Sequence, residues 1–414
     1  MGLSDDLAWR GLIKDKTFDR NSWLDKPQKF YLGIDASSDS LTIGNLAVIM
    51  LARRLIDAGW QAVLLAGGAT SLVGDPGGKE EERELKSREE IAANIDGIKS
   101  QFERLFAGQA HELVNNLDWL DDLKYLNFLR DVGKYFSMTE LIQREFVDAR
   151  MGEGGAGISY AEFSYSLLQG YDFWWLFQNK DVRLQIGASD QWGNMLSGVA
   201  LIRKKQNSEA HALSMPLVID KTTGRKFGKS EAGAVWLDPA KTSPTQFYQF
   251  WINVDDASVE EFLKVYTLLS KERIEELMKQ QSAAPQERAA QTALAREVTT
   301  LVHGEQDMVF AESVTEYLTG KTPIAEADPA ALEEVRRALP NLTVQPGTPV
   351  IEVLVRSGLA SSNSDARRLI QNRAVYINNE QFSRDHLEAG DFKNGRLMLR
   401  RGKAYKDSAL IELA

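Results

Sequence analysis

Residues 31–52 place polar side chains at the start of a helix, where they could bind an anion. An apolar run ends in Asp35, a polar turn follows, and apolar positions then recur at helical spacing. Free backbone N–H groups at a helix N-terminus attract negative charge, and Ser37, Thr42 and Asn45 add hydroxyl and amide donors. An ordinary turn between a strand and a helix would carry the same residue types, so both interpretations stay open.

Two later segments could contribute to the same site. Residues 67–79 (GGATSLVGDPGGK) follow a Val/Leu-rich strand pattern and include Asp75. Residues 184–194 (LQIGASDQWGN) place Asp190 and Gln191 between a strand and a helix. The carboxyl ends of the strands in a doubly wound sheet meet at one edge, where ligands bind. The three segments therefore predict one binding site at that edge.

A fourth group of polar residues lies on a predicted helix. Tyr165, Gln169 and Asp172 are spaced four and three residues apart, so they share one face of an otherwise apolar helix. Such a stripe is typical of a hydrogen-bonded or solvated seam as well as of a ligand site.

Several classes of protein are excluded by missing motifs. The 414 residues contain no cysteine, which excludes disulfides, thiolate metal sites and cysteine nucleophiles. Walker A and G-x-S-x-G motifs are absent, and the four histidines lack metal-ligand spacing. Gly152, Gly154 and Gly157 match G-x-G-x-x-G, but helical sequence precedes them, so we interpret them as a loop. No apolar run reaches the roughly 18 residues that span a bilayer, and no signal peptide is evident, so a cytoplasmic location is expected.

The pattern of elements predicts an α/β protein of more than one domain. A β-α-β pattern opens the chain, a helical pattern runs from Thr242 to Leu318, and five of the eleven prolines fall between Gly320 and Val350. From Pro349 onward there are eleven Lys or Arg against eight Asp or Glu, a net charge of +3, which leaves −13 on the preceding residues. This asymmetry favours contact with nucleic acid through one part only.

The order of seven motifs resembles that of the bacterial tyrosyl-tRNA synthetases, a family of class I aminoacyl-tRNA synthetases. The motifs are DSLTIGN, GGATSLVGDPGGK, EFSYSLLQGYDF, LQIGASDQWGN, KFGKS, KTSPTQFYQFWIN and LVHGE. The resemblance implies a Rossmann-like catalytic domain over residues 1–235 with a dimer-forming insertion at about 100–160. It further implies a helical anticodon-binding domain (236–320) and a ribosomal-protein-type RNA-binding domain (350–414). The prolines between Gly320 and Val350 predict that residues 321–349 are a linker between these two domains.

The reaction implied by the resemblance is the activation of tyrosine with ATP, followed by transfer to tRNA. Mg²⁺ is expected to accompany ATP without a dedicated protein site, and a homodimer is expected. Catalysis would rest on positioning and on stabilising charge on the phosphates. The family's catalytic positions match Ser37, Thr42, Asn45, Lys79, Arg83, Lys226 and Lys229.

The same resemblance assigns the substrate contacts. Tyrosine would be bound by Tyr31, Asp75, Tyr165, Gln169, Asp172 and Gln191, with Tyr31 and Asp172 at the phenol. ATP would be bound by Asp35, Gly44, Asn45, Ala188, Asp190 and Lys229. In the C-terminal module, a helix capped by Ser364 and Asp365 and a second basic run would bind RNA. The contacts would come from Arg367, Arg368, Arg373, Arg400, Arg401 and Lys403.

Two positions depart from the family pattern. The signature His-Ile-Gly-His is Thr42-Ile43-Gly44-Asn45 here, which removes an imidazole donor whose loss costs about 10²–10³ in rate. Ala188 stands where a glycine is common. A second hypothesis therefore stays open: a catalytically impaired relative that acts as an RNA-binding protein.

Overall fold

The structure is a computed structural model. It describes residues 2–75, 85–142, 147, 150–151, 157–219, 221, 224, 226–230, 233–402 and 407–414. The chain forms two compact units. The first comprises Met1–Thr242 with Ile252–Val298, and the second comprises Ser243–Trp251 with Thr299–Ala414.

The first unit is built on a six-stranded sheet in the order β1-β6-β5-β2-β3-β4. Its strands are β1 (Asp15–Lys16), β2 (Lys29–Asp35), β3 (Gln61–Gly67), β4 (His111–Asn115), β5 (Val182–Ala188) and β6 (His211–Met215). All neighbours run parallel except the edge pair β1 and β6. The chain proceeds outward from β2 through β3 to β4, then returns to β5 on the other side of β2. The order therefore reverses between β2 and β5, the place where open α/β sheets bind ligands.

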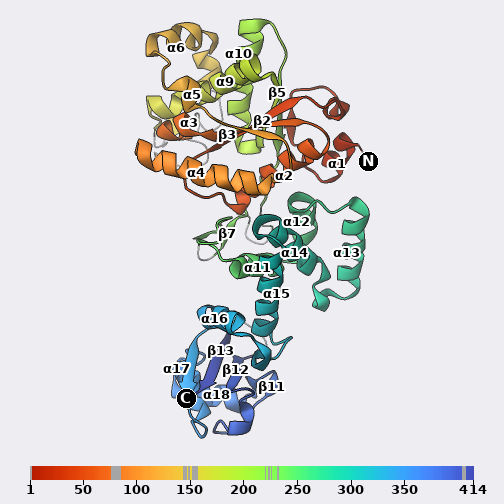
Figure 1. Cartoon of the computed structure of the whole chain (residues 1–414), viewed down its shortest axis with the longest axis vertical. Coiled ribbons are helices and arrows are strands. Elements are labelled where there is room, and N and C mark those ends of the chain that lie inside the picture. Colours follow the sequence, from red (N-terminus) through yellow and green to blue (C-terminus); the bar gives the residue numbers. More distant parts are fainter. Residues whose placement is uncertain are drawn as a thin grey trace. The chain divides into compact units, whose positions relative to one another are not determined.

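Helices cover both faces of this sheet (Figure 1). On one face lie α2 (Ile43–Asp57) and α4 (Arg88–Leu105), and on the other lie α9 (Tyr160–Lys180) and α10 (Trp192–Gln206). Because β2, β3 and β5 are packed on both faces, they are near-continuous apolar runs. Short helices complete the layers: α1 (Leu3–Trp9), η1 (Asn21–Asp25), α3 (Gly68–Val73) and η3 (Ser189–Gln191).

Between β4 and α9 the chain forms a group of short helices. They are α5 (Leu117–Leu120), α6 (Tyr125–Asp131), η2 (Gly133–Tyr135) and α7 (Met138–Ile142). Phe128, Val132 and Leu141 from this insertion form a small core with Leu167 of α9 and Leu201 of α10.

A helical part follows the sheet. The hairpin β7 (Lys229–Ser230) and β8 (Gly233–Ala234) precedes α11 (Pro244–Ile252). The first unit then continues with α12 (Val259–Tyr266), α13 (Lys271–Ala283) and η4 (Pro285–Glu287). Helix α14 (Ala289–His303) spans the division between the units, and α15 (Glu305–Thr319) belongs to the second.

The second unit contains a five-stranded sheet in the order β11-β10-β12-β13-β9. Its strands are β9 (Asn341–Val344), β10 (Val375–Ile377), β11 (Glu380–Gln381), β12 (Arg396–Arg401) and β13 (Ser408–Leu413). Its remaining elements are η5 (Ile324–Glu326), α16 (Pro329–Ala338), α17 (Val350–Arg356), α18 (Asn363–Gln371) and η6 (Ala389–Asp391).

The stretch expected as a linker is folded into this second unit. Leu332 and Val335 of α16 pack with Met398 and Leu410 of the sheet, and β9 pairs with β13. The prolines mark the starts of elements, because Pro329 opens α16 and Pro349 precedes α17. The residues expected to form a helical domain, 236–320, belong in part to the first unit and in part to the second.

Candidate active site

A cavity of about 350 Å³ opens at the carboxyl ends of β2 and β5. It lies at the reversal of strand order, and fourteen of the residues expected in the site line it together. They are Tyr31, Asp35, Ser37, Thr42, Gly44, Asn45, Asp75, Tyr165, Gln169, Asp172, Ala188, Asp190, Gln191 and Lys226. Residues separated by almost 200 positions in the sequence are thus brought to one place by the parallel sheet.

Asp172 is a buried carboxylate held by two donors. Asn116 Nδ2 and Trp119 Nε1 donate hydrogen bonds to its two oxygens at 3.0 and 2.8 Å. Burial raises the pKa of Asp172 to about 7, although these two hydrogen bonds oppose the shift. The hydroxyl of Tyr31 is also buried and has no hydrogen-bond partner among the described residues. An unpartnered hydroxyl and a carboxylate that line the same cavity form a site for a hydroxyl group.

Asp35 and Asp75 hold the polar side of the cavity. Tyr165 donates its hydroxyl proton to Asp35 Oδ2 at 2.7 Å, and Thr70 donates to Oδ1 at 2.7 Å. Burial, followed by the charge of Asp35, raises the pKa of Tyr165 well above its usual value, so this phenol stays protonated as a donor. Gln191 Nε2 donates to Asp75 Oδ2 at 2.6 Å.

Thr42 and Asn45 form a closed contact at the N-terminus of α2. The backbone N–H and the hydroxyl of Thr42 both donate to Asn45 Oδ1 at 3.0 Å. Because two donors fix the oxygen, the Nδ2 group of Asn45 is the part of this amide left to donate toward the cavity. Thr42 occupies the first position of the signature, and its two hydrogen bonds fix the side chain of Asn45 at the last position.

The start of α2 is joined to the segment after KFGKS by a short antiparallel bridge. Leu237 N–H donates to Leu41 O at 2.9 Å, Thr42 bridges Trp236, and Ile43 N–H donates to Val235 O at 3.1 Å. Val235 N–H in turn donates to Gly228 O at 3.1 Å. The start of α2 and the KFGKS segment are therefore linked by backbone hydrogen bonds.

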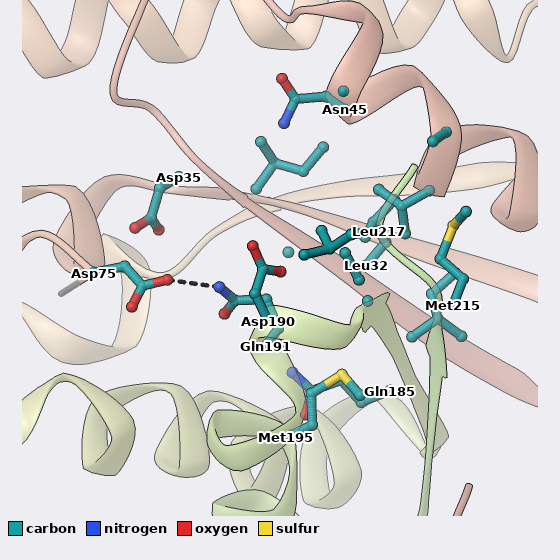
Figure 2. Close-up of a pocket in the computed structure, with 18 of the residues that line it drawn as sticks. Leu32, Asp35, Asn45, Asp75, Gln185, Asp190, Gln191, Met195, Met215 and Leu217 are labelled. Carbon is teal, nitrogen blue, oxygen red and sulfur yellow. Dashed lines mark hydrogen bonds between the residues drawn. The ribbon is translucent and has the colours of Figure 1, made fainter. Parts of the chain in front are cut away.

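Figure 2 shows the two chemical sides of the cavity. Asp35 and Asp75 lie on one side, and the apolar side chains Leu32, Met215 and Leu217 lie on the other. Asp190 lies between them and forms a 3.0 Å ion pair with Lys226 that is partly exposed. The cavity therefore offers an apolar wall next to groups that bind hydroxyls and ammonium ions.

The remaining predicted residues lie elsewhere in the structure or outside its described part. Lys79, Arg83 and Lys403 lie outside the described residues, as does the side chain of Lys229. Arg400 was expected on an RNA-binding surface, but it is only 8% exposed and donates to Ser408 Oγ at 3.1 Å and Leu318 O at 3.3 Å. This expectation is corrected, because the guanidinium is committed to the interior of its own unit.

The other basic residues of the C-terminal module differ in exposure and partners. Arg367, Arg368 and Arg373 are exposed, whereas Arg401 is paired with Asp407. The helix that carries Arg367 and Arg368 is capped by Ser362 rather than by the expected Ser364.

The structure adds residues that sequence reasoning missed. Asn116 links Asp172 to Thr70 by donating to both, at 3.0 and 3.1 Å. Gln185 lines the cavity from β5, and its buried Oε1 has no partner among the described residues. An amide in the middle of an apolar strand was the available signal for Gln185.

Comparison with known families covers most of the chain. The model for class I tRNA synthetases (W and Y) matches residues 24–318, and a model for the C-terminal domain of tyrosine–tRNA ligases matches residues 331–406. The chain belongs to the class I tRNA synthetases. Within this family, the cavity at the reversal of strand order is the candidate active site.

Individual relatives agree with this membership. The chain is 42% identical to the tyrosine–tRNA ligase of Streptococcus pneumoniae over 97% of its own length and 98% of the relative's. Among solved structures, it is similar to a C-terminally truncated mitochondrial tyrosyl-tRNA synthetase from Aspergillus nidulans, with a TM-score of 0.69 and 31% identity. That match covers 77% of this chain and 94% of the other. The corresponding protein from Coccidioides posadasii gives a TM-score of 0.66 and 30% identity, covering 76% of this chain and 91% of the other.

Two features are absent from the described residues. No group of three or more His, Asp or Glu side chains in them could hold a metal ion. In the same part of the chain, no helix is both long and apolar enough to cross a membrane.

Proposed function

We propose that this chain is a tyrosine–tRNA ligase, which joins tyrosine to the 3′ end of its tRNA at the expense of ATP. The observation that carries the proposal is the pair formed by the unpartnered hydroxyl of Tyr31 and the buried carboxylate of Asp172. Both line the cavity of a class I tRNA synthetase fold.

Tyrosine would be distinguished from phenylalanine by its hydroxyl. Asp172 can accept the phenol proton, and the hydroxyl of Tyr31 can complete the contact. A buried pair of this kind rejects the analogue without a hydroxyl by about 10⁴–10⁵, because its polar groups would then stay unpaired. Asp75, Tyr165, Gln169 and Gln191 are proposed to hold the ammonium and carboxylate groups; three of them are tied to neighbouring side chains.

ATP would occupy the other side of the cavity. The apolar wall of Leu32, Met215 and Leu217 suits a flat base, and Asp190 is placed to accept from ribose hydroxyls. Lys226 pairs with Asp190 here, so nucleotide binding would release its ammonium toward the phosphates. Such a partly exposed pair contributes about 0–1 kcal/mol, so it can be exchanged readily.

The first step would be an in-line attack by the tyrosine carboxylate on the α-phosphate of ATP. A new C(O)–O–P bond forms, the bond to the β-phosphate oxygen breaks, and pyrophosphate leaves with the electron pair. No proton needs to move, so the protein contributes orientation and positive charge. Asn45 Nδ2 and the N-terminus of α2 are proposed to stabilise the phosphates in this step.

In the second step, a ribose hydroxyl at the 3′ end of tRNA attacks the carbonyl of the adenylate. A new ester C–O bond forms, and the bond between the acyl carbon and the phosphate oxygen breaks. AMP leaves with the electron pair, and the hydroxyl proton passes to the leaving phosphate or to water. The exposed Arg367, Arg368 and Arg373 are proposed to contact phosphates of the tRNA.

Mg²⁺ is proposed to enter with ATP. The described residues contain no cluster of carboxylates or histidines that could hold a metal ion alone. Phosphate oxygens and water are proposed as its ligands.

A homodimer is proposed from the exposed apolar residues of the insertion and its neighbouring helices. These side chains are between 37 and 76% exposed and comprise Tyr125, Leu126, Leu129, Met138, Ile142, Met151, Tyr160 and Leu196. All of them except Met151 lie on helices that share one small core, and apolar patches of this kind mark protein interfaces. Leu126→Asp should yield monomers in sedimentation experiments, whereas Val309→Asp, at an exposed apolar position in the second unit, should not.

The decisive experiment is ATP–pyrophosphate exchange with tyrosine, tryptophan or phenylalanine. Exchange with tyrosine alone is expected. Folded protein that exchanges with none of the three would contradict the proposal and favour the RNA-binding relative.

A further inference from the structure

Helix α4 lies behind the turn that connects β2 to α2, and three of its residues face that turn. Asn94, Gly97 and Gln101 are spaced three and four residues apart, so they share one face of the helix. Asn94 and Gln101 are each 6% exposed. They are the two polar residues among the buried residues of this amphipathic helix.

Both side chains are hydrogen-bonded to the turn. Asn94 Nδ2 donates to Ala36 O at 2.9 Å. Leu41 N–H donates to Gln101 Oε1 at 2.9 Å, and Gln101 Nε2 donates to Ser40 Oγ at 3.1 Å. The two ends of the turn are therefore held by one face of α4.

Gly97 allows the close approach between them. A Cβ atom added at this position would lie 2.1 Å from Asp39 O. The backbone φ of Gly97 is not positive, so the requirement for glycine is one of space. Any larger residue must push the turn away from the helix.

The contact made by Gln101 extends to the segment after KFGKS. Ser40 Oγ donates to the carbonyl oxygen of Leu41 at 3.0 Å. This carbonyl oxygen also accepts from Leu237 N–H at 2.9 Å. Both backbone groups of Leu41 are thus fixed, one by α4 and the other by the segment after KFGKS. Thr42 and Asn45 follow directly.

We propose that this face of α4 positions the turn over residues 36–41, and that Gln101 is a positioning residue for the ATP half of the reaction. The inference rests on the proposed function. The turn carries Ser37 and leads into Thr42 and Asn45, whereas the residues proposed to hold tyrosine come from β2, α9 and the segments after β3 and β5. Loss of the Gln101 contacts therefore displaces donors for the phosphates without touching the tyrosine contacts.

The test replaces Gln101 by an apolar residue of similar shape. Gln101→Met leaves Leu41 N–H without its acceptor and removes the donor to Ser40 Oγ. Small misplacements of this kind cost up to about 100-fold in rate. We expect kcat/KM for ATP in adenylate formation to fall at least about tenfold, with tyrosine affinity within about twofold of wild type. Gly97→Ala should act in the same direction.

The matched control is Gln281→Met. Gln281 is 4% exposed, accepts from a backbone N–H of Ala290 at 3.3 Å and donates to Asp256 at 3.0 Å, but it does not line the cavity. It should lower thermal stability as Gln101→Met does and leave the ATP parameters unchanged.

A second readout is hydrogen exchange of the backbone amides at 36–41, which should accelerate in Gln101→Met and not in Gln281→Met. Equal effects of the two variants on ATP, or an equal loss of tyrosine and ATP binding in Gln101→Met, would overturn the inference. A wild-type protein that makes no adenylate would instead refute the proposed function, and the exchange data would still decide whether Gln101 holds the turn.

Discussion

Asp172 should make tyrosine binding depend on pH. Its pKa is about 7 in the unliganded protein, chiefly because of burial, and the ionised form is the better acceptor for a phenol proton. We expect the Kd for tyrosine to rise as pH falls below 7, by up to about tenfold for each pH unit. Fluorescence titration between pH 5.5 and 8.5 would measure it. An affinity that is flat across this range would contradict the role.

The same carboxyl should affect stability in the opposite direction. Its pKa is raised above the unfolded value, so its contribution favours the folded state below about pH 4 and is lost as pH rises toward 7. Asp172→Asn should remove this contribution. The difference in unfolding free energy between wild type and variant should therefore shift in favour of the variant from pH 5 to pH 8 in urea titrations.

Asn45→Asp would separate the structural and chemical roles of the signature position. The carboxylate can still accept from the N–H and hydroxyl of Thr42, and negative charge suits a helix N-terminus, so thermal stability should stay within about 1 kcal/mol. The variant loses the Nδ2 donor and places a negative charge near the phosphates. Adenylate formation should slow by about 10²-fold or more in single-turnover assays. Thr42→Ser, which keeps the hydroxyl, serves as the control.

The residue types predicted the side chains that line the cavity better than the buried side chains that hold them in place. Asp75, Asp190 and Gln191 follow strand patterns, so their convergence follows from the geometry of parallel sheets. Asn94, Asn116 and Gln101 could not be recognised, because a buried amide and a solvated amide look the same in one sequence. Arg400 was mispredicted because a buried guanidinium and an exposed one also look the same in one sequence.

At the scale of elements, two arginines of the Rossmann-like part donate hydrogen bonds to backbone carbonyls at the end of α12. Arg54 at the far end of α2 donates to the carbonyls of Lys264 and Val265 at 2.9 and 3.1 Å. Arg10 donates to the carbonyls of Lys264 and Leu269 at 3.0 and 2.6 Å. The last carbonyls of a helix have no partners within it, so these guanidinium groups satisfy the end of α12.

Replacing Arg54 should therefore release α12. Burial lowers the pKa of Arg54 to about 9, yet the group stays charged at neutral pH. Arg54→Met should lower the free energy of unfolding by about 3 kcal/mol, because several buried carbonyls lose their donor. Arg203→Met, at an exposed position, should change it by less than about 0.5 kcal/mol. Equal effects in calorimetry would contradict the assignment.

The order of elements was largely predictable, and two misreadings have physical causes. β4 escaped notice because HELVN is short and mixes polar with apolar residues. The linker was inferred from its prolines, but a proline that opens a helix has the same composition signal as one in a loop. Packing against Met398 and Leu410 distinguishes the two cases, and it cannot be read from the sequence around the prolines.

For the whole molecule, activation and transfer should respond differently to changes in the second unit. Arg367 and Arg368 are exposed on α18, although Arg368 pairs with Asp365 on the surface. Replacing both by serine should raise KM for tRNA and lower its dependence on salt, while ATP–pyrophosphate exchange stays within about twofold. The control is the double variant Arg336→Ser and Arg337→Ser in α16, which removes the same charge from another helix. Equal losses in both pairs would argue against a specific role for α18.

The division of the chain into two units limits how recombination between genes could transfer one unit without the other. The polypeptide passes from the first unit to the second at Ser243, returns at Ile252 and leaves again at Thr299, within the continuous helix α14. A single recombination point therefore cannot transplant either unit whole, because any cut leaves a piece of one attached to the other. Moving the second unit whole into another protein would need a further pair of cuts around residues 243–251.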